Sequence, residues 1–240
     1  MMKSTKKQLK ERGFVTDEEL SHYIDISDDE LIHLLKSSNA HDRTAGAKIT
    51  KIRKDEKHLP LLCGLLKNEK KLYTKIALSE SIEEYGVSAL QYLIPLLGVI
   101  GNNQHRQPDL IDLNKKSFPL PRDIAARVII RIGEPALPYL EEVLAEGTYT
   151  QKLEAIDAIG HIVYNCKQFR SEKYLHDLLR EEGNDELLKW KIIRAFQSFH
   201  SEEIVDFLKN IIDRNDILVL TSEAERSLNR IEKLRIGKYK

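Results

Sequence analysis

Residues 85–97 read YGVSALQYLIPLL, and residues 132–144 read IGEPALPYLEEVL. The two stretches align without a gap and share Gly, Ala, Leu, Tyr, Leu and a final Leu. Their common core is a large residue, then Leu, two free positions and two aliphatic residues, and it occurs six times. Its leucine stands at positions 31, 62, 93, 140, 175 and 208, so the steps are 31, 31, 47, 35 and 33 residues. A unit that recurs at this spacing predicts an array of helical repeats.

A second series supports the same period. Apolar residues at i, i+4 and i+7 mark one face of a further helix in each unit. The central positions of this series are 49, 82, 129, 159, 196 and 228, which step by 33, 47, 30, 37 and 32 residues. The chain is therefore expected to alternate a first helix A and a second helix B. We expect the B helices near 42–54, 70–85, 121–132, 150–164, 185–199 and 219–233.

These patterns predict an all-α protein, a right-handed α-solenoid of about six helix pairs. Residues 1–26 are expected to form an N-terminal helical cap, residues 27–236 the repeat array, and residues 237–240 a tail. Thr16 with Glu19 and Ser27 with Glu30 fit the capping box, in which the hydroxyl and the Glu satisfy backbone N–H groups at a helix start.

The step of 47 residues occurs in both series and indicates an insertion between helices A and B of the third unit. The inserted segment, near 101–119, is polar and bounded by Gly and Pro, so we expect a loop with one turn at 110–113. Loops of this length are either functional or disordered. Both helix series continue in register beyond it, which predicts that residues 101–117 are dispensable for folding.

Composition excludes a strong electrostatic role for the whole chain. Lys and Arg number 38, as do Asp and Glu, so no net field favours nucleic acid or membrane. Cys63 and Cys166 fall in different repeats, and Cys63 lies in an apolar run, which favours reduced thiols and a cytoplasmic location. The basic N-terminus has no apolar core behind it, and no apolar stretch is long enough to span a bilayer. We expect a monomer that does not enter the membrane.

Residues 121–133, PRDIAARVIIRIG, resemble the second helix of a HEAT repeat. The resemblance extends to a Leu-Pro in helix A, at 59–60 and 137–138, and covers about residues 27–236. It implies a solenoid whose B helices line a concave surface. The HEAT pattern also has a basic residue near the start of helix B, here Lys75, Arg122, Lys152 and Lys189.

HEAT-like proteins include scaffolds, adaptors, lyase-type subunits that act with bilin lyases, a di-iron hydroxylase and DNA glycosylases. The hydroxylase type uses His-Glu dipeptides as iron ligands, and none of the eight histidines here precedes Glu. The glycosylase type needs a basic face with several tryptophans, whereas this chain has one. A lyase-type subunit acting on a partner protein stays open, because it has no short motif to check.

No catalytic, cofactor-binding or metal-binding constellation is found. Glu30 and His33 have the i, i+3 spacing of di-metal bundles, but the pair occurs once and Glu30 also serves the capping box. Cys166 lies five residues from His161, off the same helical face. HExxH, GxSxG and Walker-type motifs are absent from the sequence. We therefore expect a protein that is not an enzyme.

Residues 36–75 contain eleven Lys and Arg against four acidic residues. This local excess indicates either a solvated end of the array or a patch that binds the phosphate backbone of nucleic acid. Tyr73 is the one aromatic residue there that could stack on a base. Nucleic-acid binding or DNA processing through residues 36–75 is the alternative function.

The favoured function is a scaffold or adaptor that binds a protein or peptide on the concave face. The third position of helix B lies about 170° from the apolar stripe and is expected to point outward. Exposed apolar residues beside Arg are typical of binding hot spots. The alternative is that Trp190 packs between helices. The predicted partner-binding residues are Arg43, Ile76, Arg127, Leu153, Trp190, Arg194 and Arg226.

Overall fold

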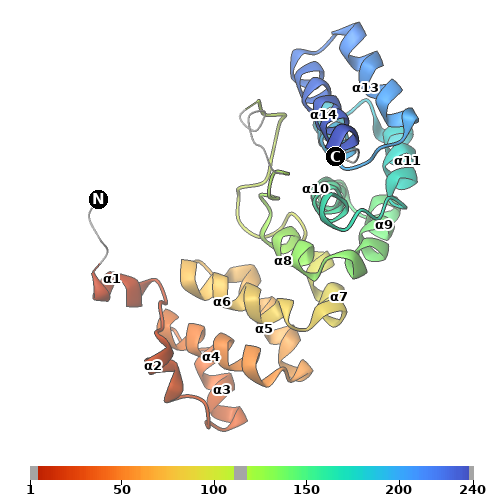
Figure 1. The fold of residues 1–240 in the computed structure, drawn as a ribbon. Coiled ribbons are helices and arrows are strands. Elements are labelled where there is room, and N and C mark those ends of the chain that lie inside the picture. Colours follow the sequence, from red (N-terminus) through yellow and green to blue (C-terminus); the bar gives the residue numbers. More distant parts are fainter. Residues whose placement is uncertain (1–4, 111–117, 238–240) are drawn as a thin grey trace. The chain divides into compact units, whose positions relative to one another are not determined.

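The computed structural model describes residues 5–110 and 118–237, with side chains up to residue 233. Over these ranges the protein is all-helical, with 14 α-helices and no strand (Figure 1). The expected all-α class is confirmed. The turn expected at 110–113 falls almost entirely outside the described residues.

Two compact units make up the chain, residues 1–93 and residues 94–240. In the first unit, helices α1 and α2 pack against α4, and α4 packs against both α3 and α6. The capping boxes predicted at Thr16 and Ser27 are present, and they begin α2 and α3. The helices of this unit are α1 (Lys6–Glu11), α2 (Asp17–Ser21), α3 (Asp28–Leu35), α4 (Ala40–Arg53), α5 (Leu59–Asn68), α6 (Leu72–Glu83) and α7 (Leu90–Leu93), with the 3-10 turns η1 (Glu56–His58) and η2 (Gly86–Ala89).

In the second unit, helices α10, α12 and α14 each pack against the B helix before them and against their own A helix. Helices α8, α10, α12 and α14 form the B row, and α9, α11 and α13 lie on its other side (Figure 1). The elements are η3 (Ile94–Leu96), α8 (Ile124–Ile132), η5 (Glu134–Ala136), α9 (Leu137–Glu146), α10 (Tyr149–Cys166), α11 (Glu172–Glu182), α12 (Glu186–Phe196), α13 (Glu202–Arg214) and α14 (Leu218–Gly237).

The boundary between the two units falls in the third repeat, whose helix A is short. Helix α7 makes one turn and passes into η3, which contains Pro95. Proline lacks the N–H that would continue the helical hydrogen bonds, and Gly98 then turns the chain at φ +73°. The repeat pattern predicts one continuous array through this point, whereas the chain groups into two units.

Helix positions agree closely with the two apolar series. All six A markers lie in or beside a described helix, and the six expected B helices correspond to α4, α6, α8, α10, α12 and α14. Within the ranges that the structure describes, no helix combines the length and apolar composition needed to cross a bilayer.

Candidate binding site

Four of the seven predicted binding residues lie on α8, α10 and α12: Arg127, Leu153, Trp190 and Arg194. We define the inner face of the second unit as the surface of these three helices that is turned away from the A helices. The described parts of the insertion, residues 98–110 and 118–123, lie beside it (Figure 1). The predicted groove is therefore already covered by a segment of the same chain.

Asp123 anchors both ends of the insertion. It is the N-cap of α8, where its Oδ1 accepts from the Ala126 N–H at 2.8 Å. Its Oδ2 accepts from the Gly98 N–H at 3.1 Å and from the Gln104 side-chain amide at 3.0 Å. Burial raises the pKa of this carboxyl, and the three donors oppose that rise. A β-carbon at position 98 would lie 2.2 Å from the Thr150 side chain, so only glycine fits there.

His105 holds the middle of the insertion against Trp190 of α12. Their ring centroids lie 5.0 Å apart with the planes at 72°, an edge-to-face contact. The Arg194 guanidinium lies over the same indole, 3.8 Å from its centroid. Burial lowers the pKa of His105 to about 4, so the imidazole is neutral at pH 7. Trp190 is fully buried as a result.

Phe118 closes the far end of the insertion. Its side chain is buried and contacts the rings of His161 and Tyr164 on α10, with centroids at 5.8 and 5.9 Å. Gly160 allows this approach, because a β-carbon there would lie 2.6 Å from the Phe118 ring. His105 lies within residues 101–117, and their predicted dispensability for folding stays a prediction.

Beneath the insertion, a buried lysine joins α12 to α10. The Lys191 ammonium donates to Glu154 Oε1 at 3.1 Å, to Asp157 Oδ2 at 2.9 Å and to the Leu153 carbonyl at 3.1 Å. Two carboxylates share this one cation. Burial raises the pKa of Glu154 to about 7. Lys191 and the neighbouring cations lower the pKa of Asp157 despite its burial. The arrangement is an ion pair beside a carboxyl that holds its proton below pH 7.

A second buried charge group joins α12 to α14. Glu223 accepts from Arg226 and lies 3.6 Å from Arg194, and Arg226 also donates to the Gln197 side chain at 3.1 Å. All four side chains are buried. Two cations therefore share the one carboxylate of Glu223, and the contact of Arg194 with Glu223 links α12 to α14.

Exposure was predicted wrongly for four of the seven residues. Leu153, Trp190, Arg194 and Arg226 are buried. His105 of the insertion contacts Trp190, while Arg194 and Arg226 lie in the charge group between α12 and α14. Arg127 is exposed, and it donates to the Pro121 carbonyl from its Nε. The alternative interpretation of Trp190 as a packed residue is the correct one.

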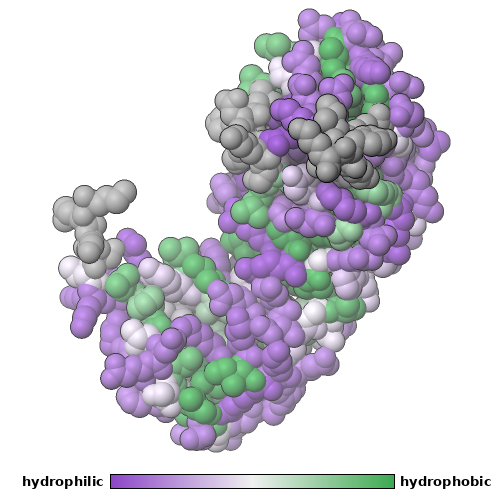
Figure 2. Space-filling model, in the orientation of Figure 1, coloured by the Kyte–Doolittle hydropathy of each residue, from purple (hydrophilic) through white to green (hydrophobic). Residues whose placement is uncertain are grey.

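In the first unit, helix α6 exposes apolar residues where the second unit covers them. Ile76 has the same position in the repeat as Trp190 and is 44 % exposed, and Leu72, one turn earlier, is 54 % exposed. Phe14 packs edge-on against Tyr73 beside them, at 5.1 Å. Figure 2 shows apolar patches among charged groups on the surface of this unit. We call Phe14, Leu72, Tyr73 and Ile76 the α6 patch.

Arg43, the other predicted residue of the first unit, makes an ion pair. Its Nε and NH2 donate to the two carboxylate oxygens of Glu69 at 2.8 and 3.0 Å, and its NH1 donates to the carbonyls of Ser37 and Ser38. Such a fork-to-carboxylate geometry holds the connection between α3, α4 and α5. The guanidinium of Arg43 is therefore bonded within the first unit.

Much of the positive charge of residues 36–75 is paired with acids from outside that range. Lys51 lies 3.6 Å from Glu80 and 3.7 Å from Glu84, and Lys54 also pairs with Glu84. Lys57 lies between two carboxylates, 3.2 Å from Asp28 and 2.8 Å from Asp55. These pairs lower the local excess that the sequence indicated.

Asp28, Asp55 and His58 form a group of possible metal ligands that the sequence did not reveal, within 4.8 Å of one another. The Lys57 ammonium pairs with both carboxylates, and His58 bonds to Asp28 at 2.8 Å, so each of these side chains already has a partner within the chain. Glu30 serves the capping box, accepting from the Ser27 N–H at 2.7 Å.

The thiols show no activated environment. Burial raises the pKa of Cys63 to about 12, so this thiol stays protonated at neutral pH. Cys166 is a half-buried free thiol. Cys63 therefore lacks the lowered pKa that a nucleophile requires.

Comparison with protein-family models, with curated proteins and with solved structures finds no match to this chain.

Proposed function

We propose that the protein is a non-catalytic scaffold that binds polypeptide segments on the faces of its B helices. One observation carries the proposal. On the inner face of the second unit, His105 of the insertion packs against Trp190 and Phe118 packs against His161, so side-chain contacts hold an irregular part of the chain there. A surface that binds one extended segment of its own chain has the shape and the polar groups to recognise another.

The first unit offers the corresponding face without such a cover. Ile76 stands where the second unit has Trp190, and it is exposed together with Leu72. Exposed apolar groups rimmed by charge mark interaction sites on many proteins. We propose the α6 patch as the place where a partner segment binds, in the way that the insertion binds the second unit.

The proposed architecture is a right-handed solenoid of HEAT-like pairs. Its support is the packing order of α6, α10, α12 and α14, each of which contacts the B helix before it and the A helix of its own pair. Such stacking leaves the faces of the B helices as extended surfaces. Nucleic-acid binding through residues 36–75 has less support, because Lys51, Lys54 and Lys57 are paired with carboxylates.

The test is a peptide selection against the full-length chain, followed by measurement of dissociation constants. Ile76→Asp should weaken the selected peptides about tenfold or more, because it places a charge in the contact. Val87→Asp is the matched control, since Val87 is 43 % exposed in the same unit but lies in η2. Equal losses in both variants, or none in Ile76→Asp, would exclude the α6 patch. A steep salt-dependent affinity for random duplex DNA would favour the nucleic-acid alternative.

A further inference from the structure

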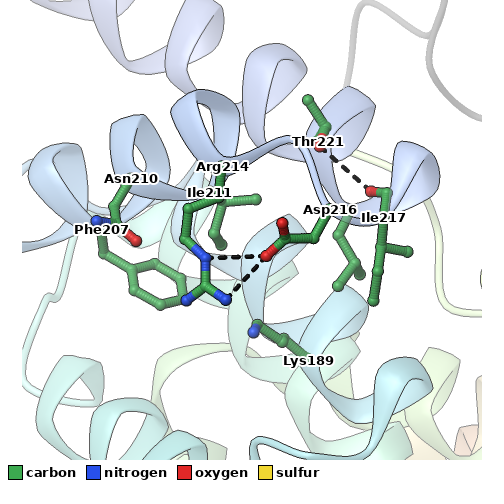
Figure 3. A pocket seen from close by; sticks show the side chains of 9 residues that line it. Lys189, Phe207, Asn210, Ile211, Arg214, Asp216, Ile217 and Thr221 are labelled. Atoms are coloured by element: carbon green, nitrogen blue, oxygen red, sulfur yellow. Dashed lines mark hydrogen bonds and ion pairs between the residues drawn. The ribbon is translucent and has the colours of Figure 1, made fainter.

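A cavity of about 190 Å³ lies in the second unit between α12, α13 and the start of α14 (Figure 3). Helix α13 ends at Arg214, and its C-cap Asn215 has a left-handed conformation (φ 47°) that sends the chain back toward α14. Phe207 and Ile211 of α13 form one wall, and Ile217 and Leu220 form the other. Arg214, Asp216 and Thr221 line it as well, so the apolar walls face polar groups. A cavity of about 150 Å³ accepts a benzene molecule, so the volume here is enough for an aliphatic group of four to six carbons.

Lys189 of α12 lines the same cavity with a cation that the fold does not neutralise. Within the described chain its ammonium has no ion pair or hydrogen bond. Its counterpart Lys152, at the start of α10, pairs with Glu182 at 2.6 Å, where Glu182 is the last residue of α11. Helix α13 instead ends in Arg214, which is itself bound by Asp216 at 2.8 Å. The acid that would pair with Lys189 is therefore missing from the repeat.

Asn210 adds a neutral polar group to the cavity wall, and its carboxamide also has no hydrogen bond within the described residues. A second cavity, of about 400 Å³, shares Lys189 and Phe207 with the first. It continues past the turn between α11 and α12, along Gly183 and Asn184. The two cavities form one groove with Lys189 at its centre.

We propose that this groove binds the C-terminus of a peptide that ends in an aliphatic residue. Lys189 binds the terminal carboxylate, the aliphatic side chain enters the smaller cavity, and Asn210 bonds to the terminal amide group. The preceding residues lie in the larger cavity. A terminal aliphatic residue meets these demands because its carboxylate and its branched side chain are attached to one carbon, whereas an internal Asp or Glu has no aliphatic branch.

The groove is lined by residues of the second unit that belong neither to the α6 patch nor to the contacts of the insertion. The inference therefore does not depend on the proposed function, and either can fail alone. The probe peptide is acetyl-Gly-Gly-Leu with a free carboxylate, and the full-length chain is titrated by calorimetry. A ligand of this size should bind with a dissociation constant on the order of 1 mM or lower.

Four comparisons test the proposal. The C-terminal amide of the same peptide should bind at least about tenfold more weakly, and Lys189→Met should cause a similar loss for the free acid. Lys209→Met, which removes an exposed cation of α13 outside the cavity, should leave binding unchanged. Isovalerate supplies the carboxylate and the aliphatic group without the peptide, and should bind more weakly than the peptide.

Equal binding of acid and amide would overturn the proposal, as would equal losses in Lys189→Met and Lys209→Met. Isovalerate binding as tightly as the peptide would also overturn it, because the groove would then select a small acid. The folded state of each variant is checked by the emission of Trp190, the single tryptophan, which lies next to Lys189 in α12. If Lys189→Met binds the free-acid peptide as tightly as the wild type does, Lys189 is not the group that binds the terminal carboxylate.

Discussion

Replacing Lys191 by Met should destabilise the second unit by about 3–5 kcal/mol, the cost of removing one partner from a buried ion pair. Lys191 is fully buried, and its ammonium is the donor that Glu154 and Asp157 share. Methionine fills a similar volume, so the loss measures the uncompensated charge rather than a cavity. A surface ion pair would contribute about 1 kcal/mol or less, and the burial decides between the two magnitudes.

The assay is urea denaturation followed by Trp190 emission. This chain has one tryptophan, and it lies in α12, so the signal reports the second unit even when the two units unfold separately. Lys189→Met is the matched control, because the neighbouring Lys189 has no partner in the described chain, and it should change stability by less than about 0.5 kcal/mol.

Compensation provides the sharper test. Replacing Glu154 by Gln and Asp157 by Asn together with Lys191→Met removes the stranded carboxylates, and should restore most of the lost stability, since an apolar or neutral replacement of a buried pair is often close to neutral. The reasoning is refuted if Lys191→Met costs less than about 1 kcal/mol, or if the triple variant is no more stable than the single one.

Three further predictions concern the insertion and its surroundings. Phe118→Ala should lower stability by about 3 kcal/mol in urea denaturation, while Leu120→Ala, at a site that is 59 % exposed, should change it little; equal small effects would show that the insertion is not packed. His105→Ala should shift the Trp190 emission to longer wavelength as water reaches the indole, and Leu120→Ala should leave that emission unchanged. Glu154 has a folded pKa raised from 4.5 to about 7, so its stabilising contribution is complete below pH 4.5 and is lost as pH rises through 7. The loss corresponds to on the order of 3 kcal/mol, and Glu154→Gln should remove that part of the pH dependence; identical stability profiles from pH 4 to 8 would contradict it.

The helical order of the chain could be predicted because it depends on local pattern. Apolar spacing of 3.6 residues per turn placed the B helices, and the hydroxyl and Glu at Thr16 and Ser27 marked two helix starts that the structure has. The 47-residue step that both series share also located the insertion near 101–119. These features need only neighbouring residues, so one sequence contains them.

The site could not be predicted in the same way. Helical geometry correctly places Trp190 opposite the apolar stripe of its own helix, but it cannot show that His105, 85 residues earlier, packs on that side. No pattern in the insertion signals this contact, since Gln104 and His105 look like any polar loop residues. The N-cap role of Asp123 before Ile124 was the one local signal available.

The sequence by itself determined an all-helical repeat protein, its helix order and the place of its insertion, because periodicity and capping act within a few turns of chain. Only the tertiary structure decided which outward positions meet solvent. Burial there depends on contacts between distant segments: the insertion covers Trp190, and Glu154 and Asp157 neutralise Lys191 across two helices. The same long-range packing leaves Ile76 open and Lys189 without an acid, and these two positions carry the proposed functions.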